Sequence, residues 1–394
     1  MKTFYFDNAA TTFPKPREVY DFMDLFYREN GANAGRGQYK ISSETSRLIF
    51  ETRELLKQLL GASNKEVIFT PTATLALNMV IQGIVKGFGK KSEDAMNVYI
   101  SPFEHNAVTR VLYALENEGF VKVNVLPIEN DFTYDLEKIG DMFEKDKPEL
   151  FVLSHVSNVC GLICPVEDLC ALGKKYGSLT VLDMAQSALL LPLNVGSDDF
   201  DFVVFAGHKT MMGPLGVSGF IANPNTLLEK VELVLFGGTG VESASQNMPS
   251  TFPARFEMGS VNIQAIAGLN AALKWWASSV DEIRSKEKEN HNRLLEILCA
   301  YDFVKIIGVP AMERVDKCTG VVSTLFDGYT ADEIGNVLDE MNIAVRTGLQ
   351  CAPLAHKTLG TFPAGTVRFS TGYFTGEKDF VELERALEYI GENR

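Results

Sequence analysis

A lysine and an aspartate each follow an apolar segment with the composition of a β-strand. Lys209 comes shortly after residues 202–206, and Asp183 ends residues 178–183. Short apolar runs bounded by glycine are typical of buried strands. Two parallel strands that end side by side would bring both side chains to one edge of a sheet, where ligands bind in open α/β proteins.

These two side chains suit one kind of chemistry. A buried amine can form a Schiff base with a carbonyl compound, and a carboxylate can hold the pyridinium N–H of pyridoxal phosphate. Each residue also has a simpler interpretation, with Lys209 as an exposed loop lysine and Asp183 as a helix N-cap. The pair therefore predicts a pyridoxal phosphate site, provided that the two strands are neighbours.

Further polar side chains follow other predicted strands. Thr72 and Thr74 lie between a strand and a helix, an arrangement typical of a phosphate site because free N–H groups and the helix dipole favour an anion. Both threonines would serve equally well as N-caps. His105 follows the next strand, and the polar residues 154–158 follow another. We expect these groups at the same edge of the sheet.

Strand and helix patterns alternate through the first part of the chain, which indicates a parallel α/β sheet. The predicted strands are residues 67–70, 98–101, 121–126, 150–154, 178–183, 202–206 and 217–222. A helix is predicted over 227–235, and one long helix or two successive helices over 262–300. From about residue 301 a β-α-β-β-α run predicts a smaller α+β domain. We place the large domain at 1–260 and the small one at 261–394.

Composition narrows the class of protein. The 394 residues are 46% hydrophobic, which is ample for a large core and suits two domains. A net charge of −14 argues against binding to nucleic acid or to anionic membranes. No apolar stretch is long enough to span a bilayer, and the N-terminus lacks the apolar region of a signal peptide. We expect a cytoplasmic protein.

Cysteine and histidine spacing predicts no metal site. The six cysteines form no Cys-x-x-Cys pair, and the five histidines show no H-E-x-x-H pattern. A chain of this size does not need a disulfide framework. We expect free thiols, most of them buried.

Nine short motifs follow one another along nearly the whole chain. They are Asp7-Asn-Ala-Ala-Thr-Thr12, Thr72-Ala-Thr74, Glu104-His105-Asn106, His155-Val-Ser-Asn158, Asp183-Met-Ala-Gln186, Gly207-His-Lys209, Arg255-Phe-Glu-Met-Gly-Ser260, Arg346-Thr-Gly-Leu-Gln-Cys351-Ala352 and Val367-Arg-Phe-Ser370. In order and spacing they resemble the class V aminotransferases, a family of fold-type I pyridoxal phosphate enzymes, and within it the cysteine desulfurases and selenocysteine lyases. The resemblance implies a mostly parallel seven-stranded sheet sandwiched by helices, with Cys351 in the small domain.

The resemblance also implies a cofactor role for each matching residue. Lys209 would carry pyridoxal phosphate as a Schiff base, and Asp183 would pair with the pyridine nitrogen. Gln186 would contact the ring oxygen, and His105 would stack on the ring. The phosphate would be bound by the backbone of Ala73, by Thr74 and His208, and by the partner subunit's Ser260.

Substrate and sulfur roles follow from the same resemblance. L-cysteine would be bound through its carboxylate by Asn158 and Arg368, and Asn8 and Arg36 are further candidates, although Arg36 has a simpler interpretation as a solvated loop charge. Cys351, on a mobile loop, would take the sulfur as a persulfide while L-alanine leaves. The enzyme would be a homodimer with shared active sites, and an acceptor protein would receive the sulfur.

Several alternatives remain open at this point. A selenocysteine lyase would use the same residues, and so would an aminotransferase or lyase that acts on another small amino acid. A non-enzymatic scaffold that only binds pyridoxal phosphate is a different class. The presence of the reactive lysine, histidine, arginine and cysteine together argues against a scaffold, which needs none of them.

Two departures from the sulfur-mobilising members of the family concern the site. Leu349 and Gln350 stand where those members usually have two histidines before the cysteine. Ala206 stands where they usually have serine, which removes one hydrogen bond to the phosphate. Because a hydrogen bond to a charged group contributes about 1.5–3 kcal/mol, the cofactor should still bind.

Overall fold

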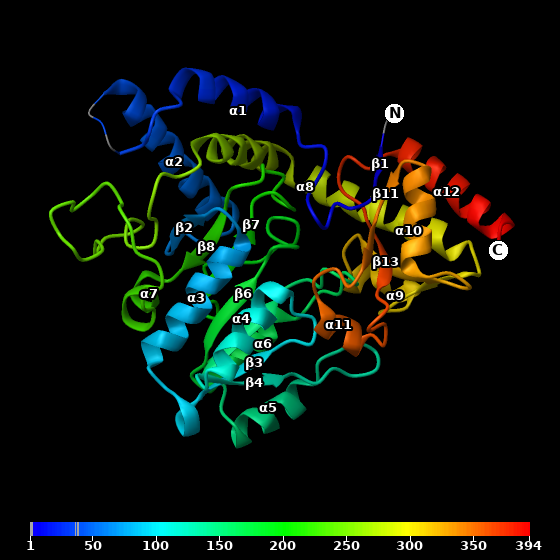
Figure 1. Ribbon diagram of the computed structural model, residues 1–394, viewed down its shortest axis with the longest axis horizontal. Coiled ribbons are helices and arrows are strands. Elements are labelled where there is room, and N and C mark those ends of the chain that lie inside the picture. Colours follow the sequence, from blue (N-terminus) through cyan, green and yellow to red (C-terminus); the bar gives the residue numbers. More distant parts are fainter. Residues whose placement is uncertain (1–2, 36, 38) are drawn as a thin grey trace.

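The computed structural model describes residues 3–35, 37 and 39–394, and a seven-stranded sheet lies at its centre (Figure 1). The strands, in spatial order, are β2 (Glu66–Thr70), β8 (Ser218–Ala222), β7 (Phe202–Ala206), β6 (Leu179–Asp183), β5 (Leu150–Ser154), β3 (Met96–Ile100) and β4 (Val121–Val125). All neighbours are parallel except β8, which runs antiparallel to β2 and β7. The predicted mostly parallel seven-stranded sheet is confirmed.

Both faces of this sheet are buried. Along β7, Val203 and Phe205 pack with Trp276 in one core, whereas Val204 packs with Ile84 in a second core. Successive side chains of a strand point to opposite faces, so the alternation places one core on each side of the sheet. Strands buried on both faces have nearly continuous apolar sequences, which is why the sequence pattern located them.

Helices cover the two faces (Figure 1). One core is covered by α3 (Ala73–Phe88), α4 (Asn106–Asn117) and α7 (Pro224–Lys230). The other is covered by α2 (Lys40–Leu59), α5 (Leu136–Lys145), α6 (Val166–Lys175) and the first half of α8 (Ile263–Cys299), on which α1 (Arg17–Asn30) packs from outside. The region 262–300 thus forms one long helix with a kink at Ser279, where φ is −147°.

A second sheet lies in the C-terminal part of the chain. It is antiparallel and contains β12 (Arg346–Gly348), β13 (Thr366–Ser370), β10 (Val321–Phe326) and β9 (Val304–Ile306). Its helices are α9 (Ala311–Lys317), α10 (Ala331–Glu340), α11 (Pro353–Thr358) and α12 (Glu377–Glu392). The short β1 (Phe4–Tyr5) pairs with β11 (Ile343–Ala344), which brings the start of the chain against this part. The division at residue 260 stays a prediction.

The helix expected over 227–235 is wrong in its extent. Asn223 caps α7 through its side chain, Pro224 occupies the first turn, and the helix ends at Lys230. Beyond it the chain runs along α3, where the N–H of Glu232 donates to the carbonyl of Gly83 at 3.0 Å. Any Cβ at Gly83 would meet this segment at 2.5 Å. The segment after Lys230 therefore packs closely against Gly83 in an extended conformation, where the local sequence pattern predicted a helix.

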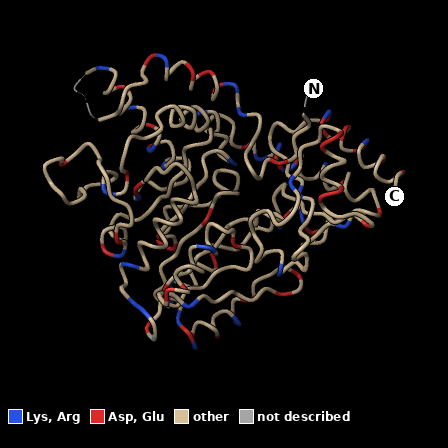
Figure 2. The backbone as a smooth tube through the Cα atoms, viewed as in Figure 1, with Lys and Arg blue, Asp and Glu red and all other residues tan. Residues whose placement is uncertain are grey.

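Charged residues of both signs are interspersed along outer helices such as α1 and α12 (Figure 2). Within residues 3–35, 37 and 39–394, none of the helices combines the length and apolar character needed to cross a membrane. The same described residues contain no cluster of three or more histidine, cysteine, aspartate or glutamate side chains suited to a metal ion.

Candidate active site

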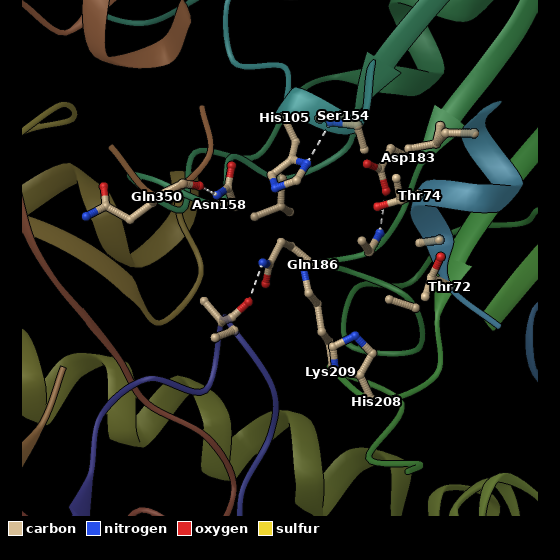
Figure 3. Close-up of a pocket in the computed structure, with 18 of the residues that line it drawn as sticks. Thr72, Thr74, His105, Ser154, Asn158, Asp183, Gln186, His208, Lys209 and Gln350 are labelled. Carbon is tan, nitrogen blue, oxygen red and sulfur yellow. Dashed lines mark hydrogen bonds between the residues drawn. The ribbon is translucent and has the colours of Figure 1, made fainter. Parts of the chain in front are cut away.

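A cavity of about 280 Å³ opens at the carboxyl ends of β5, β6 and β7 (Figure 3). Of the residues proposed from sequence, its wall contains Ala73, Thr74, His105, Asn158, Asp183, Gln186, His208, Lys209 and Arg368. Ala206, Ser154, Arg346 and Gln350 also line it. The expectation that the strand ends share one pocket is met for these residues.

Lys209 reaches this cavity from the turn that follows β7 (Figure 3). Its backbone is held by the Thr12 hydroxyl, which donates to the Lys209 carbonyl at 2.8 Å. Burial lowers the pKa of Lys209 to about 8, although the nearby Asp183 carboxylate acts in the opposite direction. Among the residues that the structure describes, Nζ has no hydrogen-bond or ion-pair partner. The amine is therefore available for reaction near neutral pH.

This pKa makes a testable prediction about Schiff-base formation. The cofactor-free protein mixed with pyridoxal phosphate should react faster as pH rises, with the rate half-maximal near pH 8 and level about one pH unit higher, because only the neutral amine attacks a carbonyl carbon. Stopped-flow absorbance between about pH 6 and 10 measures the rate, and a lysine peptide run in parallel corrects for ionisation of the cofactor itself. A rate that still rises steeply at the upper end would contradict the lowered pKa.

Asp183 ends β6, one strand away from Lys209. Its Oδ1 accepts the backbone N–H of Ala185 at 2.8 Å, so it does stabilise the following turn. Burial raises the pKa of Asp183, while the Ala185 N–H and the Lys209 ammonium lower it. Its second oxygen, Oδ2, accepts no hydrogen bond within the described part of the chain and can accept an N–H in the cavity.

His105 faces the cavity across from Lys209 (Figure 3). It is the N-cap of α4, and its Nδ1 accepts the N–H of Ala107 at 3.0 Å. Burial, with the Lys209 charge, lowers the pKa of His105 to about 4. The ring is therefore neutral at pH 7 and carries its proton on Nε2. A neutral imidazole suits contact with an aromatic ring and does not repel a neighbouring amine.

The N-terminus of α3 forms another part of the cavity wall. Thr72 is the N-cap, since its hydroxyl oxygen accepts the N–H of Leu75 at 3.1 Å. The backbone N–H groups of Ala73 and Thr74 then have no partner among the described residues. The Nδ1 of His208 is buried and also unpartnered. Free donors at the positive end of a 16-residue helix are suited to a phosphate group.

Two arginines lie side by side at another wall. Arg368 and Arg346 are directly paired between β13 and β12. Arg368 is 1% exposed; its Nη2 pairs with Asp7 Oδ1 at 2.5 Å, and its Nη1 donates to the Asn158 carbonyl at 2.8 Å. Its Nε has no partner. Burial lowers the pKa of Arg368 and Asp7 opposes this. The pair of guanidinium groups favours a small carboxylate in the cavity.

Cys351 lies outside the cavity wall but beside it. It is exposed, in the turn between β12 and α11, and the Nη2 of Arg346 contacts its Sγ at 3.2 Å. It lines a neighbouring groove of about 640 Å³, and His105 and Thr74 line both spaces. Of the other five cysteines only Cys299 is exposed, so the expectation of mostly buried free thiols is confirmed. The Cys351 thiol is thus the one beside the mouth of the cavity.

Two further candidates, Asn8 and Ser260, do not line the cavity. The side chain of Asn8 donates to the Ser370 carbonyl at 3.0 Å. Ser260 accepts a hydrogen bond from the Asn33 side chain at 3.0 Å, on an exposed loop away from the pocket of its own chain. Arg36 lies outside the described residues. Their roles in substrate or phosphate binding stay predictions.

Sequence reasoning missed two acidic residues that support the site. Asp7 supplies the carboxylate for Arg368, and Glu104 is buried beneath the cavity, where it accepts hydrogen bonds from Ser154 N at 2.7 Å and Ser101 Oγ at 2.6 Å. Burial raises the pKa of Glu104 to about 7. Both residues stand inside the motifs quoted above, but the motifs gave no sign of their partners. The position of Glu104 next to His105 was the only available signal.

Comparison with known proteins agrees with this geometry. The sequence model of the family described as "Aminotransferase class-V" matches residues 4–383. A relative from Aeropyrum pernix, described as "Probable cysteine desulfurase", is 31% identical over an alignment of 401 residues that covers 98% of this chain and 94% of the relative. A relative from Streptomyces coelicolor with the same description is 32% identical over 397 residues, covering 99% and 92%.

A solved structure leads to the same family. The apo structure of cysteine desulfurase from Thermococcus onnurineus NA1 superposes with a TM-score of 0.88 and 28% identity, covering 100% of this chain and 95% of that one. The family match, the relatives and this superposition each extend over nearly the whole length. The chain belongs to the class V aminotransferase family.

Proposed function

We propose that the protein is a pyridoxal phosphate-dependent cysteine desulfurase, which converts L-cysteine to L-alanine and keeps the sulfur on Cys351 as a persulfide. One observation carries this proposal: an exposed thiol lies 3.2 Å from the Arg346 guanidinium at the mouth of a cavity that holds Lys209 and Asp183. The relatives described as probable cysteine desulfurases support it over 94% and 92% of their lengths.

The residues of the cavity fit pyridoxal phosphate. Lys209 presents an unpartnered amine, Asp183 an unpartnered carboxylate oxygen, and the start of α3 free N–H groups for the phosphate. Gln186, whose Nε2 donates to the Ala9 carbonyl at 2.8 Å, has its amide oxygen left for the ring. When bound, the cofactor supplies an electron sink for negative charge at the α-carbon of an amino acid.

Lys209 is the proton carrier of the site. With its pKa lowered to about 8 by burial, it exchanges protons near neutral pH, as a general base must. It would take the α-proton of the substrate and hold it on Nζ. Asp183 would keep the pyridine nitrogen protonated through Oδ2, and neutral His105 would cover the ring from the side opposite Lys209.

The arginine pair would orient the substrate. The unpartnered Nε of Arg368 and the guanidinium of Arg346 would bind the carboxylate of L-cysteine, and Asn158 fixes Arg368 through its carbonyl. A carboxylate held there directs the substrate side chain along the same wall as the Arg346–Cys351 contact. In the proposed binding mode the substrate sulfur would lie toward the Cys351 thiol.

Cys351 would complete the reaction. Its thiolate attacks the sulfur of the substrate, an S–S bond forms, and the bond between the substrate's β-carbon and its sulfur breaks. The electron pair of that bond returns to carbon, which takes up a proton to give L-alanine. The balance is L-cysteine plus protein thiol to L-alanine plus protein persulfide, and no external oxidant is needed.

We further propose a cytoplasmic homodimer that passes its sulfur to an acceptor protein. The loop after α7 projects from the body of the chain and carries exposed Phe236 and Ser260 (Figure 1). In a dimer, the partner subunit's Ser260 would complete the phosphate site at α3.

The test is alanine formation by the purified protein loaded with pyridoxal phosphate. With L-cysteine and no reductant we expect about one alanine per subunit; with a thiol reductant we expect continuous turnover and release of sulfide. L-serine, which lacks sulfur, is the control substrate. Absence of alanine from L-cysteine would overturn the proposal, and rapid alanine formation from selenocysteine alone would move the assignment to a selenocysteine lyase.

A further inference from the structure

The turn that carries Cys351 has an unusual backbone. Gln350 and Cys351 have φ values of 39° and 60°, in the left-handed region that residues other than glycine rarely adopt. Two such residues in succession persist only where surrounding contacts hold them, and such backbone is found preferentially at functional sites. The contacts that hold this turn therefore determine where the thiol lies.

Gln350 supplies most of those contacts. Its side chain is 2% exposed and points away from the cavity (Figure 3). Oε1 accepts from His356 Nε2 at 2.8 Å and lies 3.3 Å from the Thr366 hydroxyl. Nε2 donates to the carbonyls of Thr366 at 3.1 Å and Arg346 at 3.4 Å. Both polar atoms of the amide thus make hydrogen bonds, and the Thr366 hydroxyl, which donates to Ser323 Oγ at 2.9 Å, is only a long contact of Oε1.

His356 is fixed in one protonation state by the same network. It is fully buried, and burial lowers its pKa to about 4, so the ring is neutral at pH 7. The Gln350 oxygen can only accept, so Nε2 carries the proton. Nδ1 accepts from the Thr361 hydroxyl at 2.7 Å. Because both ring nitrogens are satisfied, His356 is a rigid anchor for the glutamine.

The turn is tied to the substrate site through its own backbone. The Gln350 carbonyl accepts the side-chain N–H of Asn158 at 2.7 Å, and the Asn158 carbonyl accepts from Arg368. The Cys351 carbonyl accepts the N–H of Asn106, at the start of α4, at 2.8 Å. A continuous chain of hydrogen bonds therefore runs from the buried His356 through the turn to the arginine that faces the cavity.

We propose that Gln350, anchored by His356 and Thr366, is a positioning residue that holds the Cys351 thiol against Arg346 at the mouth of the cavity. This rests on the proposed function, in which that thiol receives the sulfur. Glutamine stands where related enzymes usually have histidine, and a neutral imidazole has one N–H, so it could not donate to both carbonyls while accepting from His356. Because none of the side-chain bonds of Gln350 reaches Lys209 or Asp183, we expect its loss to slow sulfur transfer more than the reaction of L-cysteine at the lysine.

The experiment compares Gln350→Leu, His356→Leu and the double variant with the wild-type holoenzyme, and uses Thr358→Ala, an exposed position on α11, as the matched control. Stopped-flow absorbance reports the reaction of L-cysteine with the cofactor. Quenched samples analysed by mass spectrometry report persulfide on Cys351. Hydrogen exchange of the peptide around residues 346–356 reports the order of the turn without any substrate.

We expect the single variants to form persulfide about 10- to 100-fold more slowly, as for a reacting group displaced by about 1 Å. The absorbance change should stay within about two-fold of wild type, and exchange should accelerate in the 346–356 peptide only. The double variant should be no slower than either single one, because both remove the same anchor. Gln350→Glu keeps the acceptor for His356 and should fall between Gln350→Leu and wild type.

Two results would overturn the proposal. One is persulfide formation at the wild-type rate in Gln350→Leu and His356→Leu. The other is a loss of the absorbance change as large as the loss of persulfide formation, which would show a general structural role. If Gln350→Leu does not fold, Gln350→Glu is judged by the same criteria. Failure of the proposed function would give a different result, because the wild-type enzyme itself would then form no persulfide. Hydrogen exchange would still test whether Gln350 and His356 hold the turn.

Discussion

Replacing Lys209 with alanine should abolish the visible absorbance of the Schiff base and reduce alanine formation from L-cysteine by at least about 10⁴-fold. The side chain has two proposed roles, covalent attachment of the cofactor and transfer of the substrate's α-proton. Proton transfer by a side chain alone contributes about 10²- to 10⁴-fold to a rate. Loss of the covalent attachment adds to this. The fold should survive, because Nζ makes no hydrogen bond or ion pair within the described part of the chain.

The measurement is the absorbance spectrum and the rate of alanine formation for Lys209→Ala beside Lys230→Ala, an exposed lysine at the end of α7. Lys230→Ala should match wild type in both. Wild-type turnover by Lys209→Ala would remove Lys209 from the chemistry. Retention of the Schiff-base spectrum would mean that another amine carries the cofactor.

Replacing Cys351 with alanine should leave the cofactor spectrum unchanged and eliminate persulfide. Cys351 makes no hydrogen bond to Lys209 or Asp183 in the described structure, and its side chain meets Arg346 at 3.2 Å. We expect alanine formation to fall by about 10³-fold or more, because covalent catalysis by a thiolate cannot be replaced by water at this step. The absorbance change on adding L-cysteine should persist.

Cys299→Ala is the matched control for this variant, since Cys299 is the other exposed cysteine and lies at the end of α8. It should form alanine and persulfide as wild type does. If Cys351→Ala still released alanine and sulfide at the normal rate, sulfur would leave without the proposed thiol. If Cys299→Ala lost the activity in its place, the acceptor would have been misassigned.

The neighbouring strand ends that carry Lys209 and Asp183 were predictable because their signals are local. A short apolar run bounded by glycine marks a strand, and the alternation of strands and helices implies that β6 and β7 are parallel neighbours. Periodicity also explains why seven strands were located correctly. The helical extent of α7 was not predictable, since it depends on Gly83 of α3, far away in sequence.

The electrostatics of the site depended on contacts that no local pattern contains. Asp7 and Arg368 are separated by 361 positions, yet Asp7 accepts from Nη2 of the arginine, while Nε has no partner among the described residues. The side-chain contacts of Gln350 come from three different segments and were visible only as a departure from a motif. Sequence reasoning located the reactive groups, whereas the structure revealed which of their atoms are already occupied.

The most direct test of the proposed sulfur transfer is mass spectrometry of the wild-type holoenzyme after one equivalent of L-cysteine, without reductant. The peptide that contains Cys351 should gain one sulfur atom, removable by a thiol reductant, and an equal amount of L-alanine should appear in solution. Alanine without added sulfur on Cys351, or sulfur on another cysteine, would contradict the proposal.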